Sequence, residues 1–136
     1  MKLNTHLTFN GNCREAFEFY EKCLGGKIMF SMTVGESPMA AQSSPEWQKG
    51  ILHISLRLGD DIVTGADAFP GSYAKPQGFG VMFSLDQPAD AERIFTELAE
   101  GGTIRMPMQE TFWALRFGEC VDRFGIPWMI NCSKPM

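Results

Sequence analysis

Two stretches of the chain carry apolar residues at the three- and four-residue spacing of an amphipathic helix. In the first, Asn12 and Glu15 have the spacing of a capping box, and Gly25-Gly26 ends the pattern. In the second, Pro88 occupies the first turn and Gly101-Gly102 follows the last apolar residue. The two apolar sets match position for position: Ala16, Phe19, Tyr20, Cys23 and Leu24, and Ala91, Ile94, Phe95, Leu98 and Ala99. The match indicates an internal duplication.

An alternating pattern of apolar and polar residues precedes each predicted helix, as in a half-buried strand. The apolar positions are Leu3, Thr5, Leu7 and Phe9 in the first copy, and Phe79, Val81, Phe83 and Leu85 in the second. Residues 51–58 alternate in the same way. We expect the apolar stripes to face the helices. His6, His53, Arg57 and Met82 then lie on the opposite faces.

Residues 56–60 (Leu-Arg-Leu-Gly-Asp) also match residues 115–119 (Leu-Arg-Phe-Gly-Glu), which predicts that Arg116 is equivalent to Arg57 and lies on the same kind of face. The offset of this match implies a much shorter loop in the second copy, because residues 35–50 of the first are rich in Gly, Pro and Ser. Each copy therefore reads strand, helix, strand, loop and strand hairpin. This pattern predicts an α+β fold of two βαβββ modules: about 1–67, a linker of about 68–77, and about 78–136. One helix per module leaves a sheet face uncovered, so we expect a cavity between two curved sheets.

Composition and charge narrow the class of protein. Hydrophobic residues make up 44% of the chain, which is typical of a globular domain. No apolar run approaches the about 20 residues of a membrane helix, and the N-terminal segment is too polar for a signal peptide. The net charge of −4 favours neither nucleic acid nor an anionic membrane as a partner. We expect a cytoplasmic protein that binds neither.

The residues that carry chemistry are few. The four cysteines form no C-x-x-C pair and have no neighbouring His, so they indicate neither zinc nor a redox motif. There is no P-loop and no G-x-S-x-G elbow. Two Arg on the cavity side would favour an anionic or enolic oxygen on the ligand. The candidate ligand-binding residues are His6, His53, Arg57, Met82, Gln109, Trp113 and Arg116.

Several segments, in order along nearly the whole chain, resemble the PhnB-like group of the vicinal-oxygen-chelate superfamily, which includes glyoxalases, bleomycin-resistance proteins and dioxygenases. They are residues 9–13 (Phe-Asn-Gly-Asn-Cys), Phe19-Tyr20, residues 24–26 (Leu-Gly-Gly), residues 109–113 (Gln-Glu-Thr-Phe-Trp), residues 122–128 (Asp-Arg-Phe-Gly-Ile-Pro-Trp) and Ile130-Asn131. The resemblance implies the duplicated βαβββ fold. It also implies a homodimer, since homodimers are common in the superfamily.

In metal-dependent members of this superfamily, the ligands come from the first and last strand of each module. The corresponding positions are His6, about Thr64, Gly80 and about Met129, of which only His6 is a good ligand for a divalent metal. His53, with Glu110 or Glu119, would have to complete an unorthodox site. We therefore expect neither a metal nor another cofactor.

Two functions remain open. The first is the binding of a small organic molecule in the cavity without chemistry, as in bleomycin-resistance proteins. The alternative is a lyase, isomerase or dioxygenase-type enzyme in which a metal or a His/Arg pair stabilises an enolate-like intermediate. The first function agrees better with the sequence, because three of the four metal-ligand positions have no good metal-binding side chain. The sequence does not identify the ligand or decide whether the protein is an enzyme.

Overall fold

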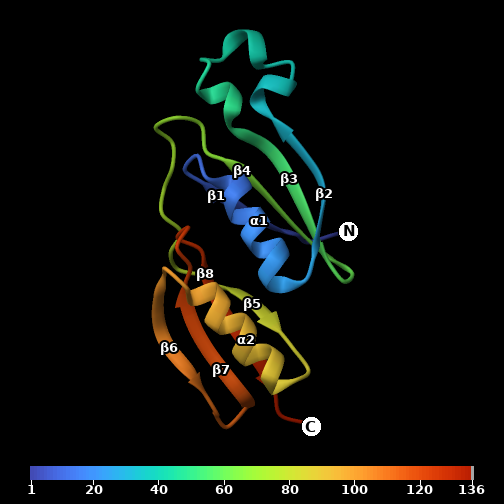
Figure 1. The fold of residues 1–136 in the computed structure, drawn as a ribbon, viewed down its shortest axis with the longest axis vertical. Coiled ribbons are helices and arrows are strands. Elements are labelled where there is room, and N and C mark those ends of the chain that lie inside the picture. Colours follow the sequence, from blue (N-terminus) through green and yellow to red (C-terminus); the bar gives the residue numbers. More distant parts are fainter. Residues whose placement is uncertain (136) are drawn as a thin grey trace. The chain divides into compact units, whose positions relative to one another are not determined.

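The computed structural model describes residues 1–135, and the chain divides into two compact units. The first unit comprises Met1–Ala74, and the second begins at Lys75. Each unit has its own sheet and its own helix (Figure 1).

The first unit follows the predicted order of elements. It contains β1 (Thr5–Phe9), α1 (Cys13–Leu24), β2 (Lys27–Thr33), three short 3-10 helices η1 (Val34–Glu36), η2 (Ala40–Gln42) and η3 (Trp47–Lys49), β3 (Ile51–Leu58) and β4 (Asp61–Asp67). The strand order is β1-β4-β3-β2, in which β1 is parallel to β4 and the other neighbours are antiparallel. The long loop predicted before β3 contains the three 3-10 helices. Leu3, predicted within the first strand, precedes it and is fully exposed.

The second unit repeats this topology. It contains β5 (Val81–Ser84), α2 (Pro88–Ala99), β6 (Thr103–Gln109), β7 (Ala114–Val121) and β8 (Pro127–Ser133), with the strand order β5-β8-β7-β6. Here β5 is parallel to β8, and only four residues separate β6 from β7. The predicted α+β fold of two βαβββ modules is confirmed.

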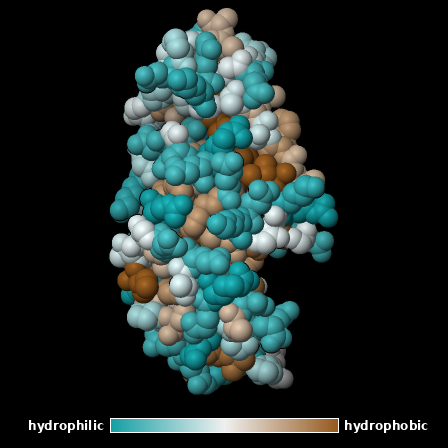
Figure 2. Space-filling view, in the orientation of Figure 1, coloured by the Kyte–Doolittle hydropathy of each residue, from teal (hydrophilic) through white to brown (hydrophobic). Residues whose placement is uncertain are grey.

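Both helices are amphipathic and bury one stripe against their own sheet. In α2 the buried residues are Ala91, Ile94, Phe95 and Leu98, all predicted. In α1, Phe17 is buried where the sequence pattern selected Phe19, because Phe17 packs edge-on against Phe9 at 5.9 Å and against Tyr20 at 5.8 Å between ring centroids. The surface over the two helices is mainly hydrophilic, with small apolar patches (Figure 2). Within residues 1–135, neither helix has the length and apolarity needed to cross a membrane.

The N-terminus of α1 is held by a residue from the other end of the unit. The predicted capping box is wrong: Asn12 is the N-cap residue, but its side chain makes no capping hydrogen bond. Instead, Asp67 at the end of β4 accepts hydrogen bonds at Oδ1 from the backbone N–H groups of Gly11 (2.9 Å) and Cys13 (3.0 Å). Its Oδ2 accepts from the N–H of Ile51 at 2.8 Å. Because β1 and β4 are adjacent, with Phe9 paired to Asp67, the Asp67 carboxylate reaches the start of α1 and joins it to the start of β3.

The second unit has a buried carboxylate at a different place. Asp122, 3% exposed, accepts hydrogen bonds at Oδ1 from the N–H groups of Phe124 (2.9 Å) and Ile126 (3.0 Å). Its Oδ2 accepts from the indole Nε1 of Trp128 at 2.9 Å. These bonds hold the turn between β7 and β8 and orient the Trp128 ring.

Replacing Asp67 by Asn tests its role in the first unit. Asp67 is only 7% exposed, and Asn has one acceptor oxygen for three backbone donors, so at least one buried N–H loses its partner. We expect Asp67→Asn to lower the free energy of unfolding by about 2 kcal/mol in urea titrations followed by circular dichroism. The exposed turn variant Asp60→Asn is the matched control, with a change below about 0.5 kcal/mol. Equal stability of the two variants would contradict the structural role of Asp67.

Candidate functional site

In each unit most of the candidate side chains on strands lie on the sheet face that points away from the helix, called here the non-helix face. In the first unit, β4 shows the alternation clearly: Val63, Gly65 and Asp67 are buried, and the residues between them are half-exposed. Cross-strand partners share a face, and the register pairs His6 with Thr64, Thr64 with Ser55 and Ser55 with Phe30. His6 therefore lies on the non-helix face, as predicted.

His6 has a defined hydrogen-bond partner. Its Nδ1 lies 2.7 Å from Oγ1 of Thr64 on the neighbouring strand. The pKa of His6 lies below the ordinary value of a histidine, mainly because the ring is partly buried although the residue as a whole is exposed, and secondly because His53 carries charge of the same sign when protonated. The His6 ring therefore stays neutral to a lower pH than the ring of a free histidine.

His53 and Arg57 follow on β3 on the same face. His53 pairs with Met32 of β2, and its ring centroid lies 5.9 Å from that of Phe30, which is 48% exposed. Arg57 is exposed and pairs with Lys27. The first unit therefore brings His6 and His53 within electrostatic reach of each other and places Arg57 further along the same strand.

The non-helix face of the second unit contains Met82 and Gln109. Met82, 51% exposed, pairs with Met129 of β8, and Met129 pairs with Glu119 of β7. Gln109 is exposed and pairs with Phe117, which pairs in turn with Asn131. Met82 lies on the predicted side of the sheet.

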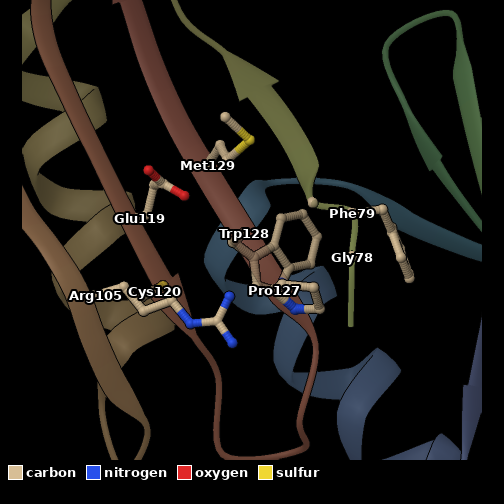
Figure 3. Close-up of a pocket in the computed structure, with 9 residues that line it drawn as sticks. Gly78, Phe79, Arg105, Glu119, Cys120, Pro127, Trp128 and Met129 are labelled. Atoms are coloured by element: carbon tan, nitrogen blue, oxygen red, sulfur yellow. The ribbon is translucent and has the colours of Figure 1, made fainter. Parts of the chain in front are cut away.

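A cavity of about 360 Å³ lies within the second unit beside this face. Its lining comes from the segment before β5 and from β6, β7 and β8: Gly78, Phe79, Gly80, Arg105, Glu119, Cys120, Pro127, Trp128 and Met129. Figure 3 shows the Glu119 carboxylate and the Met129 side chain on neighbouring strands, with the Arg105 guanidinium extending toward Pro127. The cavity thus combines apolar and sulfur-containing walls with one cation and one anion.

The loop between β6 and β7 carries an exposed aromatic pair. Phe112 is 89% exposed, and its ring packs edge-on against Trp113 at 4.8 Å between centroids. Trp113 also contacts Phe117 at 5.3 Å, and its carbonyl accepts a hydrogen bond from the N–H of Lys134. The Lys134 ammonium lies 3.0 Å from Glu110 and lowers the pKa of that carboxyl group by hydrogen bonding and by its charge. Trp113 therefore belongs to a loop anchored to the C-terminal strand, outside the lining of the cavity.

The prediction that Arg116 lies on the same kind of face as Arg57 is wrong. Arg116 pairs with Cys132, and its Nε lies 3.0 Å from Oε1 of Glu92 on α2, so its side chain is on the helix side of the sheet. The sequence match fails because Gly59 and Asp60 form the turn after β3, whereas Gly118 and Glu119 lie inside β7, which continues to Val121. An odd shift in register turns a side chain to the other face.

The sequence resembles a superfamily whose metal-dependent members hold the metal at four positions. At the corresponding positions of this chain, most side chains are poor metal ligands. The first unit offers His6 and Thr64, and the second offers Gly80 and Met129. Glycine has no side-chain donor, and a thioether is a poor ligand for a hard or borderline divalent ion. In the described part of the chain, no three His, Cys, Asp or Glu side chains form a group able to hold a metal ion. These residues do not fit a four-ligand site.

The cysteines are all buried and reduced. Burial, with the nearby Asp122 charge, raises the pKa of Cys120 to about 12, and burial also raises the pKa of Cys13. Although Cys120 lines the cavity, its thiol is protonated at neutral pH and is a poor nucleophile.

Sequence reasoning missed part of the cavity lining. Arg105 was not selected because β6 is irregular, with register shifts on both sides of Met106, so its pattern does not alternate. Phe79 was assigned to a core stripe, but it precedes β5 and is 54% exposed. Glu119 and Met129 were considered only as metal ligands, and nothing in the sequence pattern brings them next to Arg105.

Comparisons with known proteins agree on the family. The family model described as the glyoxalase/bleomycin resistance protein/dioxygenase superfamily matches residues 2–130. Protein YjdN of Escherichia coli (strain K12) is 37% identical over 142 residues, which cover 98% of this chain and 97% of YjdN. Among solved structures, protein PA1353 from Pseudomonas aeruginosa has a TM-score of 0.88 at 39% identity and covers 99% of both chains.

The PhnB protein from Bacillus cereus shares the fold, with a TM-score of 0.81 at 18% identity over 98% of this chain and 100% of that one. The family match covers nearly all of the sequence, and YjdN and PA1353 are related to it over almost their full lengths. The chain therefore belongs to the glyoxalase/bleomycin resistance protein/dioxygenase superfamily.

Proposed function

We propose that the protein binds a small organic molecule in the cavity of the second unit, without a metal in the four ligand positions of the superfamily. The observation that carries this proposal is the lining of the cavity, in which Phe79, Trp128 and Met129 accompany Arg105 and Glu119. Ligand pockets typically enclose about 300–1,000 Å³ and combine apolar walls with a few polar groups. The cavity, at about 360 Å³, suits a compact ligand.

The chemistry of the lining indicates what such a ligand carries. Phe79 is 54% exposed and offers an aromatic face, and the flexible thioether of Met129 adapts to an irregular apolar body. Arg105 donates hydrogen bonds to an acidic or carbonyl oxygen, while Glu119 accepts them from N–H or O–H groups. The ligand is therefore an apolar molecule with at least one polar oxygen.

The ligand-binding residues selected from the sequence lie outside the lining of this cavity. Met82 neighbours Met129 in the register and continues the sulfur-containing surface beyond the cavity. The prediction that His6, His53, Arg57, Gln109 and Trp113 contact a ligand is independent of this cavity, because the first three belong to the first unit and the last two are not in the lining. Arg116 is withdrawn from this set because it is paired with Glu92 on the helix side.

Titration with 8-anilinonaphthalene-1-sulfonate tests the cavity, because this fluorescent probe has an apolar ring system and a sulfonate. We expect saturable binding to the folded protein at one site. Phe79→Ala removes aromatic contact and Arg105→Gln removes the cation, and each should weaken binding about tenfold, equivalent to about 1.4 kcal/mol.

Phe69→Ala is the matched control, since Phe69 is an equally large and exposed residue (61%) outside the cavity. It should leave the dissociation constant unchanged. Circular dichroism confirms that each variant is folded, since partly folded chains also bind this probe. Equal weakening by Phe69→Ala and Phe79→Ala would contradict binding in the cavity.

The metal part of the proposal has its own test. Because His6 is the only strong ligand among the four positions, we expect less than about 0.1 equivalent of Zn, Ni, Mn or Fe in protein purified without chelator, measured by elemental analysis. Adding these ions should not raise the melting temperature. A stoichiometric metal that is lost in His6→Gln would contradict the proposal.

A second candidate function is favoured by the state of His6. An imidazole with a lowered pKa, oriented by the Thr64 hydroxyl at 2.7 Å, has the properties of a general base near neutral pH. In that case the protein would be an enzyme that abstracts a proton from a carbon acid. Arg57, on the same sheet face as His6, would be the candidate group that stabilises the resulting oxyanion.

An NMR titration of the two histidines tests this second candidate. We expect His6 to titrate below the ordinary histidine pKa and its pKa to rise in His53→Gln, because the repulsion between two imidazolium charges is then absent. As the pH falls, His6 is protonated in the unfolded chain before it is protonated in the folded one. Its contribution to stability is therefore present above the ordinary histidine pKa and is lost as the pH falls through the lowered pKa. A His6 that titrates at or above the ordinary value would exclude it as a tuned base.

A further inference from the structure

A cavity of about 430 Å³ lies in the first unit, where β2 begins and β3 ends. It is lined by Gly25, Gly26, Lys27, Met29, Arg57 and Gly59. Its residues belong entirely to the first unit, so it is separate from the cavity used in the proposed function. The only charged side chains in its lining are the cations of Lys27 and Arg57.

These two cations are cross-strand partners. Lys27 of β2 and Arg57 of β3 pair directly in the antiparallel register, and both residues are exposed. Like charges at directly opposite positions repel each other and destabilise a sheet. Within residues 1–135, the ion pairs closer than 4.0 Å involve Arg93, Arg116 and Lys134, and none involves Lys27 or Arg57. Within the described residues, no acidic side chain therefore lies close enough to Lys27 and Arg57 to offset their repulsion.

The lining holds Arg57 in place and leaves space beside it. The Arg57 Nε donates a hydrogen bond to the carbonyl of Gly59 at 3.3 Å, which orients the guanidinium and leaves its terminal nitrogens as donors. Gly26 is required for packing, since a Cβ there would meet the Arg57 carbonyl. Gly25 and Gly59 have positive φ angles and, as glycines, leave the backbone accessible at the wall.

The neighbouring acidic residues do not form ion pairs with Lys27 or Arg57. Glu21 on α1 uses Oε2 to accept a hydrogen bond from the N–H of Ile28 at 2.7 Å. Asp60 and Asp61 follow Gly59 at the β3–β4 turn, yet neither lies within 4.0 Å of the two cations. Met29 occupies a bulge in β2, is 51% exposed and gives the cavity an apolar wall.

We propose that this cavity binds a phosphate monoester of a small organic group. A phosphate dianion matches two adjacent cations in charge, since Arg offers a planar set of donors and Lys offers a compact point charge. The volume exceeds that of a bare phosphate, and Met29 supplies a contact for the organic part. In a chain with a net charge of −4, a pair of unpaired cations in a cavity is a specific feature and not the consequence of a basic surface.

Glycerol phosphate, inorganic phosphate and malonate are the probes, added at pH 8 and constant ionic strength to the full-length, isotope-labelled protein. We expect saturable chemical-shift changes at the amides of Gly25, Gly26 and Gly59, with the ester binding most tightly. Arg57→Met and Lys27→Met should each weaken its binding about tenfold.

Lys49→Met is the matched control, because it removes one cation from the same unit outside this cavity and should leave the affinity unchanged. Equal affinities in all variants, or shifts that never saturate, would overturn the site. Malonate or inorganic phosphate binding as tightly as the ester would overturn the assignment of the ligand class. Binding of the fluorescent sulfonate in the second unit should persist in these variants, so failure of this site is distinguishable from failure of the proposed function.

Discussion

The Asp67 carboxylate is the interaction on which the first unit depends. It is buried at the end of β4 and accepts hydrogen bonds from the backbone at Gly11, Cys13 and Ile51. A buried charge is stable only when its hydrogen-bonding capacity is used, so this one residue ties the start of α1 to the start of β3. Asp122 stabilises the β7–β8 turn of the second unit with the same chemistry at a different position.

Once one face of each sheet is packed against its helix, the other face receives the polar and sulfur-containing side chains. The strand period of two makes this separation unavoidable: His6, Thr64 and Ser55 share one face, while Leu7, Gly65 and Ile54 share the other. The same geometry in the second unit aligns Met82, Met129 and Glu119. Substitutions at these alternate positions therefore change the chemistry of the non-helix face without changing the core.

The sequence predicted most of the fold because its signals are local. The helical spacing and the alternation in the strands each arise within one element, and the structure agrees on both helices and on the repeated order of elements. Two of the errors concern relations between elements. Asn12 has the sequence of a cap, but its side chain makes no capping hydrogen bond, and Asp67 from β4 accepts instead from the N–H groups of Gly11 and Cys13. Arg116 matches Arg57 in its neighbours, but β7 continues past the matched segment, which places Arg116 against Glu92.

The amino-acid sequence by itself therefore determined the duplicated βαβββ plan and the faces on which His6, His53 and Met82 lie. Only the tertiary structure decided which residues become neighbours. It placed Arg105 and Glu119 around the cavity of the second unit, and it set Lys27 opposite Arg57 in the first. The physical reason is that periodicity fixes the orientation of a side chain within its own strand, whereas register, bulges and turn lengths fix its partners, and these depend on backbone hydrogen bonds between distant segments.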